Sequence, residues 1–292
     1  MRRSRIVGTG SFVPDRIVEN DEVCRPLRLT PADVIQRTGI RTRRWVTDGQ
    51  STSDLAVEAG ALAIEMSEMS PAVIDAVLVS TTSPDMAFPP TACLAAARLG
   101  ATSAAAFDVA ASCSGFLYGL SMADAFIRSG QFQRCLVIGA EVKSRFLNHA
   151  DDATAVLFGD GAGAAVLEAV DDVRHNGPGI LGLRVYADGS KHDLIRLPAG
   201  GSRRPTTHET VRDGLHAIQI RGGPLFRVAV RRLAAAITDL LKEFGVSLSE
   251  VKHAVFHQAN GRILSALASR LGLDPAVMAP VSTRQAPGGS FC

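Results

Sequence analysis

The chain has 292 residues, of which 46% are hydrophobic and 21% are charged. This composition provides enough apolar residues for a sizeable core and excludes a disordered or collagen-like chain. The formal net charge is only +2, which is too weak to indicate binding to nucleic acid.

Cysteine usage and hydropathy indicate a protein of the reducing cytoplasm. The cysteines show no C-x-x-C spacing, so neither a disulfide framework nor a zinc site is predicted. We expect no membrane span, because no run of 18 apolar residues occurs, and no signal peptide, because the basic N-terminus has no apolar region. The five cysteines are Cys24, Cys93, Cys113, Cys135 and Cys292.

The first half of the chain alternates apolar strands with helices. Thr30 followed by Pro31 predicts a helix start, and Ser53 or Asp54 is the expected N-cap of a later helix. The apolar strands between these helices predict the α/β class, with sheets buried on both faces. We expect strands at 5–10, 76–80, 104–109 and 135–139 and within 158–170, and helices over 53–66 and 90–99.

The second half repeats part of the first. Residues 246–260 resemble 69–84, and ALASRLG at 266–272 matches LAAARLG at 94–100. This internal duplication predicts two related domains, residues 1–172 and 173–292. We expect strands from residue 180 and over 251–260, a polar loop at 198–213, and helices over 224–245 and 263–271.

The two copies differ in length. After Gly100 the first copy continues to Val170, whereas only a short segment follows Gly272 before Cys292. That segment has no strand or helix pattern. We therefore expect the second copy to be incomplete, and our hypothesis is a chain that is truncated or ends in a shifted reading frame.

Cys113 is the first candidate catalytic residue. It stands between an apolar strand and a long apolar segment, which predicts a position at a helix N-terminus. Backbone N–H groups and the helix dipole stabilise a thiolate there, so the cysteine is a candidate nucleophile. The helix is apolar nearly all round, which predicts that it is buried. The alternative is a small buried hydrophobe, the usual role of a free cysteine, and both interpretations stay open here.

His257 is the second candidate, at the polar tip of the strand predicted over 251–260. In a duplicated fold, corresponding strand ends face a shared cleft, so His257 is expected to meet Cys113. A neutral imidazole can donate to a substrate oxygen, take a proton or polarise a carbonyl. Asn260 at the same tip is either an amide donor to an oxyanion or a turn or cap residue.

Several long motifs, in the same order, resemble β-ketoacyl-acyl-carrier-protein synthase III. The resemblance implies a thiolase-like duplicated α/β/α/β/α fold with mixed sheets, a homodimer, and acyl-CoA or acyl-carrier-protein thioesters as substrates without a bound cofactor. The motifs are IVGTGSFVP, RTGIRTR, TTSPDMAFPPTAC, FDVAASCSGFLYGL, FGDGAGAAV, YADGS and HQANGRI.

The same resemblance assigns roles to individual residues. Cys113 becomes the acylated nucleophile, and His257 helps to decarboxylate the malonyl extender and to stabilise the resulting enolate or oxyanion. Arg37 resembles the family's cofactor-contacting arginine. Phe88 falls where the family reaches across the dimer interface to the acyl pocket. The implied reaction is decarboxylative condensation of a starter acyl thioester with malonyl-acyl-carrier protein, which initiates fatty-acid or polyketide synthesis.

The chain departs from the family pattern in two informative places. The family's asparagine motif, expected after Gly272, is absent, and Asn260 is not a substitute for it. Asp33 occupies the position where synthases that use acyl-CoA commonly have a tryptophan that stacks on adenine. This departure favours an acyl-carrier protein or an unusual starter over acyl-CoA as the donor.

Basic residues on two predicted helices suggest a partner surface. Arg227 and Arg231 share one helix face, and Arg262 and Arg270 lie on the next helix. By resemblance they form the docking surface for an acidic carrier protein, and the alternative is a solvated helix face. Two further functions remain open: acyl transfer from Cys113 to a hydroxyl or amine without condensation, and an inactive partner subunit.

Overall fold

One mixed sheet organises the first half of the protein in the computed structural model, which describes residues 2–171 and 177–278. Its five strands are arranged in the order β1-β7-β6-β4-β5. Strand β4 pairs in parallel with β5 and β6, whereas β7 is antiparallel to both β6 and β1. The strands are β1 (Arg2–Phe12), β4 (Ala76–Ser80), β5 (Ala105–Val109), β6 (Arg134–Val142) and β7 (Asp160–Asp171).

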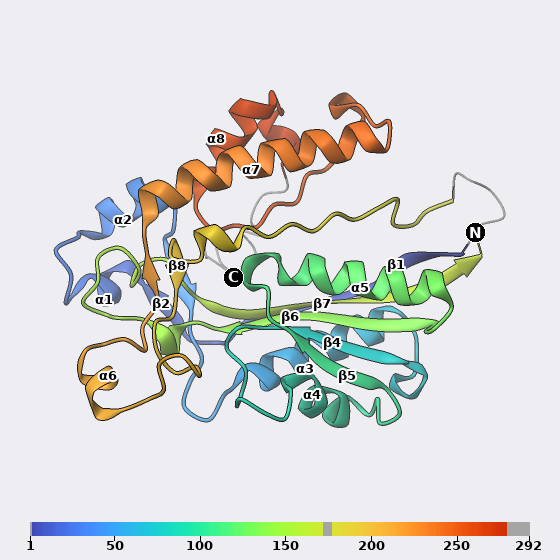
Figure 1. The fold of residues 1–292 in the computed structure, drawn as a ribbon, viewed down its shortest axis with the longest axis horizontal. Coiled ribbons are helices and arrows are strands. Elements are labelled where there is room, and N and C mark those ends of the chain that lie inside the picture. Colours follow the sequence, from blue (N-terminus) through green and yellow to red (C-terminus); the bar gives the residue numbers. More distant parts are fainter. Residues whose placement is uncertain (1, 172–176, 279–292) are drawn as a thin grey trace.

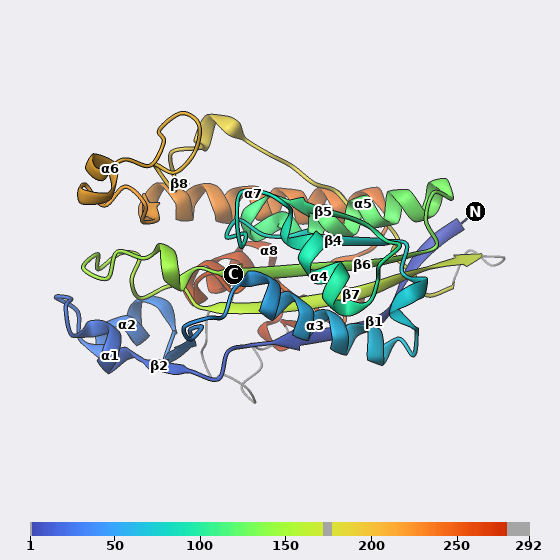
Figure 2. The ribbon, with the colours of Figure 1, turned by 90° about the horizontal axis from the view of Figure 1, so that it is seen from below.

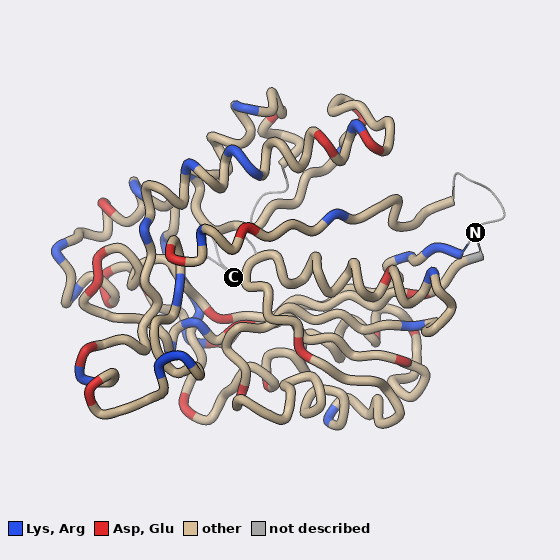
Figure 3. Tube along the Cα trace, viewed as in Figure 1, with Lys and Arg blue, Asp and Glu red and all other residues tan. Residues whose placement is uncertain are grey.

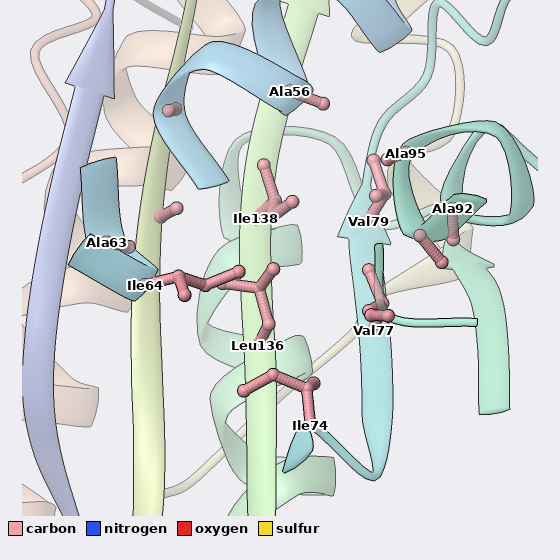
Figure 4. Close-up of a cluster of buried hydrophobic side chains, with 14 of the residues drawn as sticks. Ala56, Ala63, Ile64, Ile74, Val77, Val79, Ala92, Ala95, Leu136 and Ile138 are labelled. Carbon is pink, nitrogen blue, oxygen red and sulfur yellow. The ribbon is translucent and has the colours of Figure 1, made fainter. Parts of the chain in front are cut away.

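Helices cover both faces of this sheet (Figures 1 and 2). Helices α3 (Thr52–Met66) and α4 (Thr91–Leu99) pack on one face, and α5 (Gly115–Ser129) packs on the other. Successive residues of a strand point to opposite faces, so Val77 joins the core under α3 and α4 while Leu78 joins the core under α5. Figure 4 shows the first of these cores, where α3 and α4 cover β4 and β6.

The remaining elements lie around the sheet. A ribbon of β2 (Ile17–Glu19) and β3 (Thr42–Arg44) accompanies α1 (Asn20–Cys24) and α2 (Pro31–Thr38). The second half contains β8 (Ile195–Arg196), α6 (His208–Arg212), β9 (Gln219–Ile220), α7 (Gly222–Glu243) and α8 (Gly261–Leu271). Single helical turns are η1 (Pro71–Val73), η2 (Ser112–Ser114), η3 (Ser144–Phe146), η4 (Gly189–Lys191), η5 (Leu248–Glu250) and η6 (Pro275–Val277).

Local sequence explains where the helices of the first half begin. Pro31 is the first residue of α2, and Thr30 and Asp33 form a capping box at its start, as the Thr-Pro pair predicts. The expected N-cap of α3 is wrong. Ser51 is the cap, because its backbone N–H donates to Asp54 Oδ2 at 2.6 Å and its hydroxyl completes a capping box.

The strands predicted in the first half are confirmed, and those predicted in the second half are wrong. From Ile180 the chain runs between α5 and α7 without forming a ladder, held by Tyr118 Oη donating to the Tyr186 carbonyl at 3.0 Å (Figure 1). In the segment 251–260 only Ala254 forms a bridge, to Met278. The backbone N–H and C=O groups of a strand need hydrogen-bond partners on a neighbouring strand. The described second half provides no such strand for these two segments.

Helix α5 is not buried all round, contrary to the sequence-based expectation. Leu120, Ala123 and Ile127 face the sheet and are buried, but Leu117 is 50% exposed. Its outer face is open because the described second half places an extended chain, not a sheet, beside it. No helix within 2–171 and 177–278 has the length and apolar character to cross a bilayer.

Candidate active site

Cys113 lies at the junction between β5 and α5. Strand β5 ends at Val109, and a single helical turn, Ser112–Ser114, precedes the first residue of α5, Gly115. Ser112 has φ of 48°, in the left-handed region that side chains rarely adopt. Such a conformation costs about 1–3 kcal/mol and is often found at active sites. The strained turn places Cys113 beyond the carboxyl end of the parallel strands.

The start of α5 is packed tightly against the end of β4. A Cβ atom on Gly115 would lie 1.9 Å from Ser80 Oγ, so a larger residue there would require the Ser80 side chain to shift. Ser80 pairs with Val109 on β5 and with Gly139 on β6, so β4 and β5 end together at this edge while β6 continues to Val142. The close approach fixes the turn that contains Cys113 relative to the sheet.

The electrostatic environment of Cys113 differs from the sequence-based expectation. Cys113 is exposed at the surface. Its thiol pKa is nevertheless raised, first by desolvation and then by Glu141, while Lys143 lowers the pKa. The thiol is therefore the major form at neutral pH.

The sequence reasoning missed Glu141 and Lys143, the two charged residues that influence the pKa of Cys113. They form an ion pair with 3.0 Å between Lys143 Nζ and Glu141 Oε2. The side chain of Lys143 is 12% exposed and that of Glu141 is 8% exposed. The sequence feature that could have identified them is the pair of opposite charges at the end of the apolar run CLVIGAEVK. Buried charges of this kind are almost always paired.

His257 lies in the irregular segment before α8. Desolvation lowers its pKa, so the neutral imidazole predominates at neutral pH. Within the described residues no hydrogen bond joins His257 to Cys113. The strand expected to position His257 does not form in the described residues.

Asn260 is the N-cap of α8. Its side-chain Oδ1 accepts the backbone N–H of Arg262 at 2.8 Å, which is the cap interpretation of this residue. The start of α8 lies against the end of α2, because a Cβ on Gly261 would be 3.4 Å from the Thr38 carbonyl oxygen. Arg37 precedes Thr38, so Arg37 and Asn260 lie on neighbouring elements.

Phe88 and Asp33 occupy different kinds of position. Phe88 lies in the loop between β4 and α4 and is 83% exposed, so its ring is available to a partner. Asp33 accepts from the Thr30 backbone and hydroxyl in the capping box of α2. Those hydrogen bonds from Thr30 lower the pKa of Asp33.

The predicted arginines are all exposed on two neighbouring helices (Figure 3). Arg227 and Arg231 lie on α7, and Arg262 and Arg270 lie on α8; α7 and α8 contact each other. In the part of the chain that the structure describes, none of the four has an acidic partner within salt-bridge distance. The neighbouring Arg232 differs, since it pairs with Asp188 at 3.3 Å. The same range contains no His, Cys, Asp and Glu group suited to a metal ion.

The layered mixed sheet, with a cysteine between β5 and α5, defines the class of thiolase-fold condensing enzymes. The crystal structure of 3-oxoacyl-[acyl-carrier-protein] synthase III from Aquifex aeolicus VF5 matches with a TM-score of 0.84 and 35% identity, over 94% of this chain and 83% of that one. The priming β-ketosynthase of the R1128 polyketide pathway matches with a TM-score of 0.82 and 34% identity, over 95% and 81%.

Sequence comparisons identify the family within this class of enzymes. The family model of 3-oxoacyl-[acyl-carrier-protein (ACP)] synthase III matches residues 107–189. The β-ketoacyl-[acyl-carrier-protein] synthase III of Caldanaerobacter subterraneus subsp. tengcongensis is 43% identical over 268 residues, 92% of this chain and 80% of that protein. The chain belongs to the β-ketoacyl-acyl-carrier-protein synthase III family, which confirms the family and fold predicted from the motifs.

Proposed function

We propose that this chain condenses a starter acyl thioester with malonyl-acyl-carrier protein, with Cys113 as the acyl acceptor. The observation that supports Cys113 most directly is its position on the strained turn between β5 and α5, inside the segment 107–189 that matches the family model. The proposed substrates are acyl-CoA or acyl-carrier-protein thioesters, and no cofactor takes part. The two domains predicted at 1–172 and 173–292 remain a prediction.

Two steps account for the reaction. In the first, the Cys113 thiolate attacks the starter carbonyl; a new S–C bond forms, the donor thioester bond breaks, and the donor thiol leaves with a proton. In the second, the malonyl carboxylate leaves as CO₂ and its bonding electrons form the bond to the acyl carbon. Cys113 is released as thiolate, and the product is a β-ketoacyl thioester.

His257 is proposed to assist the second step. Its lowered pKa keeps the imidazole neutral, so it can donate a hydrogen bond to the thioester oxygen as the enolate develops. Arg37 and Asn260 are proposed to line the route of the phosphopantetheine arm, which is consistent with the contact between α2 and α8. Phe88 is proposed to lie at a homodimer interface, which is consistent with its exposed ring.

The exposed arginines of α7 and α8 are proposed to dock the acyl-carrier protein. Arg227, Arg231, Arg262 and Arg270 present positive charge without acidic partners among the described residues. Charge reversal, Arg231→Glu, is expected to raise the KM for malonyl-acyl-carrier protein and to weaken its salt dependence. The control is Arg212→Glu on α6, which leaves both unchanged. An equal effect of both variants would contradict a localised docking surface.

The reaction is tested by CO₂ release from malonyl-acyl-carrier protein labelled in its free carboxyl group. Release that depends on a starter thioester and is lost in Cys113→Ser supports condensation. Acyl transfer to a hydroxyl or amine without CO₂ release would instead support the second activity considered from the sequence, which the comparisons do not favour. Absence of both reactions in a folded protein would support an inactive partner subunit.

A further inference from the structure

Glu141 and Lys143 form a buried ion pair that the reaction described above does not use. Glu141 is the penultimate residue of β6 and Lys143 directly follows the strand. Lys143 Nζ lies 3.0 Å from Glu141 Oε2, and both side chains are nearly buried. Taking two charges out of water costs several kcal/mol per ion, and their attraction offsets this only in good geometry. A buried pair is therefore weak grounds for a purely stabilising role.

The geometry of the pair is fixed by the segment that follows β4. Glu141 accepts the backbone N–H of Thr82 at 3.0 Å, the Thr82 hydroxyl at 2.8 Å and the Thr81 hydroxyl at 3.3 Å. The Ser83 hydroxyl also donates to Glu141, and Lys143 Nζ donates to Thr82 Oγ1. Both charged groups are thus held in one place by several hydrogen bonds.

The sheet register places this pair beside the nucleophile. Ser80 on β4 pairs with Val109 on β5 and with Gly139 on β6. Cys113 lies four residues beyond Val109, and Lys143 lies four residues beyond Gly139. The backbone N–H of Thr81 donates to the Val109 carbonyl at 3.3 Å, and a Cβ on Gly115 would lie 1.9 Å from Ser80 Oγ. The turn that contains Cys113 and the segment that binds the ion pair therefore both lie at the end of β4.

Other acidic groups near this edge are occupied by amide donors. Asp108 on β5 accepts the backbone N–H groups of Thr91 and Ala92, each at 2.8 Å. Asp160 on β7 accepts from the backbone of Val46 and Ser144, and Asp85 accepts from that of Ser53. From the second half, no hydrogen bond between His257 and Cys113 is found in the described residues. Apart from desolvation and a hydrogen bond, the pKa of Cys113 responds to Glu141, which raises it, and to Lys143, which lowers it.

We propose that Lys143 and Glu141 are positioning residues for the acylation step and together set the fraction of Cys113 that is thiolate. The inference rests on the proposed role of Cys113 as acyl acceptor. The ammonium of Lys143 favours the thiolate and the carboxylate of Glu141 favours the thiol. The thiol proton leaves to solvent before attack, and the departing donor thiolate takes a proton from solvent.

The test is the rate of Cys113 alkylation by iodoacetamide as a function of pH, followed by peptide mass spectrometry. Lys143→Met is expected to slow alkylation at neutral pH about tenfold and to move the midpoint of the profile up by about one pH unit. Glu141→Gln keeps one of the two side-chain acceptor oxygens, removes the negative charge and is expected to shift both quantities in the opposite direction. General damage to the site does not produce two shifts of opposite sign.

Controls are available within the same molecule. Cys93 on α4 is exposed, so its alkylation serves as an internal reference that both variants leave unchanged. Lys143→Arg retains the charge and is expected to retain the wild-type profile, as is Lys242→Met on the exposed part of α7. If Lys143→Met does not fold, the double variant Glu141→Gln/Lys143→Met removes both charges together and is expected to show a smaller shift than Glu141→Gln alone.

Unchanged Cys113 profiles in both single variants, or shifts of the same sign, would overturn the proposal. Alkylation needs neither a starter thioester nor malonyl-acyl-carrier protein. Failure of the proposed function would therefore appear separately, as normal alkylation of Cys113 without any acyl adduct.

Discussion

The two halves of this chain share sequence motifs but bury their apolar residues very differently. In the first half, β4 and the centre of β6 contain fully buried branched side chains covered by helices on both sides. In the second half, the 22-residue helix α7 buries only Val230 and Ala234, and α8 buries only Leu267 and Ala268. The strand pattern of the second copy does not form a sheet in the described residues, so a repeated pattern needs partner strands before it becomes structure.

The largest expected effect is on core packing. Leu136→Ala in β6 removes a fully buried side chain and is expected to lower the free energy of unfolding by about 2–5 kcal/mol. The matched change in the second half, Leu233→Ala on α7, removes a side chain that is 44% exposed and is expected to cost less than about 1 kcal/mol. Denaturant unfolding measures both, and equal losses would refute the difference between the halves.

A second comparison uses the first residue of a helix in each half. Gly115→Ala introduces a Cβ 1.9 Å from Ser80 Oγ and is expected to cost about 1–3 kcal/mol while displacing Cys113. Gly222→Ala at the start of α7 meets open space and is expected to change stability by less than about 0.5 kcal/mol. Thermal unfolding and the alkylation rate of Cys113 are the measurements. Tolerance of Gly115→Ala in both would refute the close packing of α5 on β4.

Removal of a helix N-cap is expected to lower stability by a similar, smaller amount in each half. Thr30→Ala removes the cap of α2 and Asn260→Ala removes the cap of α8, and each is expected to cost about 1 kcal/mol. Asn260→Ser restores a capping oxygen and separates this role from the proposed one in substrate binding. If Asn260→Ser is as stable as wild type but has a raised KM, the amide acts on substrate as well as on the helix.

The smallest effect is a pH dependence from His257. Desolvation lowers its folded-state pKa below the unfolded value of about 6.5, so folding favours the neutral ring. The resulting stability is fully present above the unfolded pKa and is lost as the pH falls from there through the folded pKa. Urea unfolding at several pH values should show this loss, and His257→Asn should remove it. An unchanged slope in that variant would exclude His257 as the source.

Local patterns explain why the first half was predictable from sequence. Apolar runs of strand length, the Thr30-Pro31 helix start and the helix-terminating Gly100 each specify structure with residues close in the chain. Strand pairing in the second half depends on distant partners, which neither the segment from Ile180 nor that around His257 reveals by itself.

The candidate site shows the same division. The position of Cys113 between β5 and α5 was predictable because the change from strand to helix pattern is local. Its electrostatic surroundings were missed, because Glu141 and Lys143, which influence the pKa of Cys113, are distant from it in sequence. The exposed outer face of α5 was also missed, since helix periodicity does not reveal what covers a helix.

The most direct test of the central claim is intact mass after incubation with a panel of acyl-CoA and acyl-carrier-protein donors, beside Cys113→Ser. The claim is that the first half of the chain positions Cys113 as an acyl acceptor. It predicts an acyl adduct on the wild type, none on Cys113→Ser, and a starter identified by the added mass. A folded wild-type protein that gains no adduct from any donor, or an adduct that persists in Cys113→Ser, would contradict it.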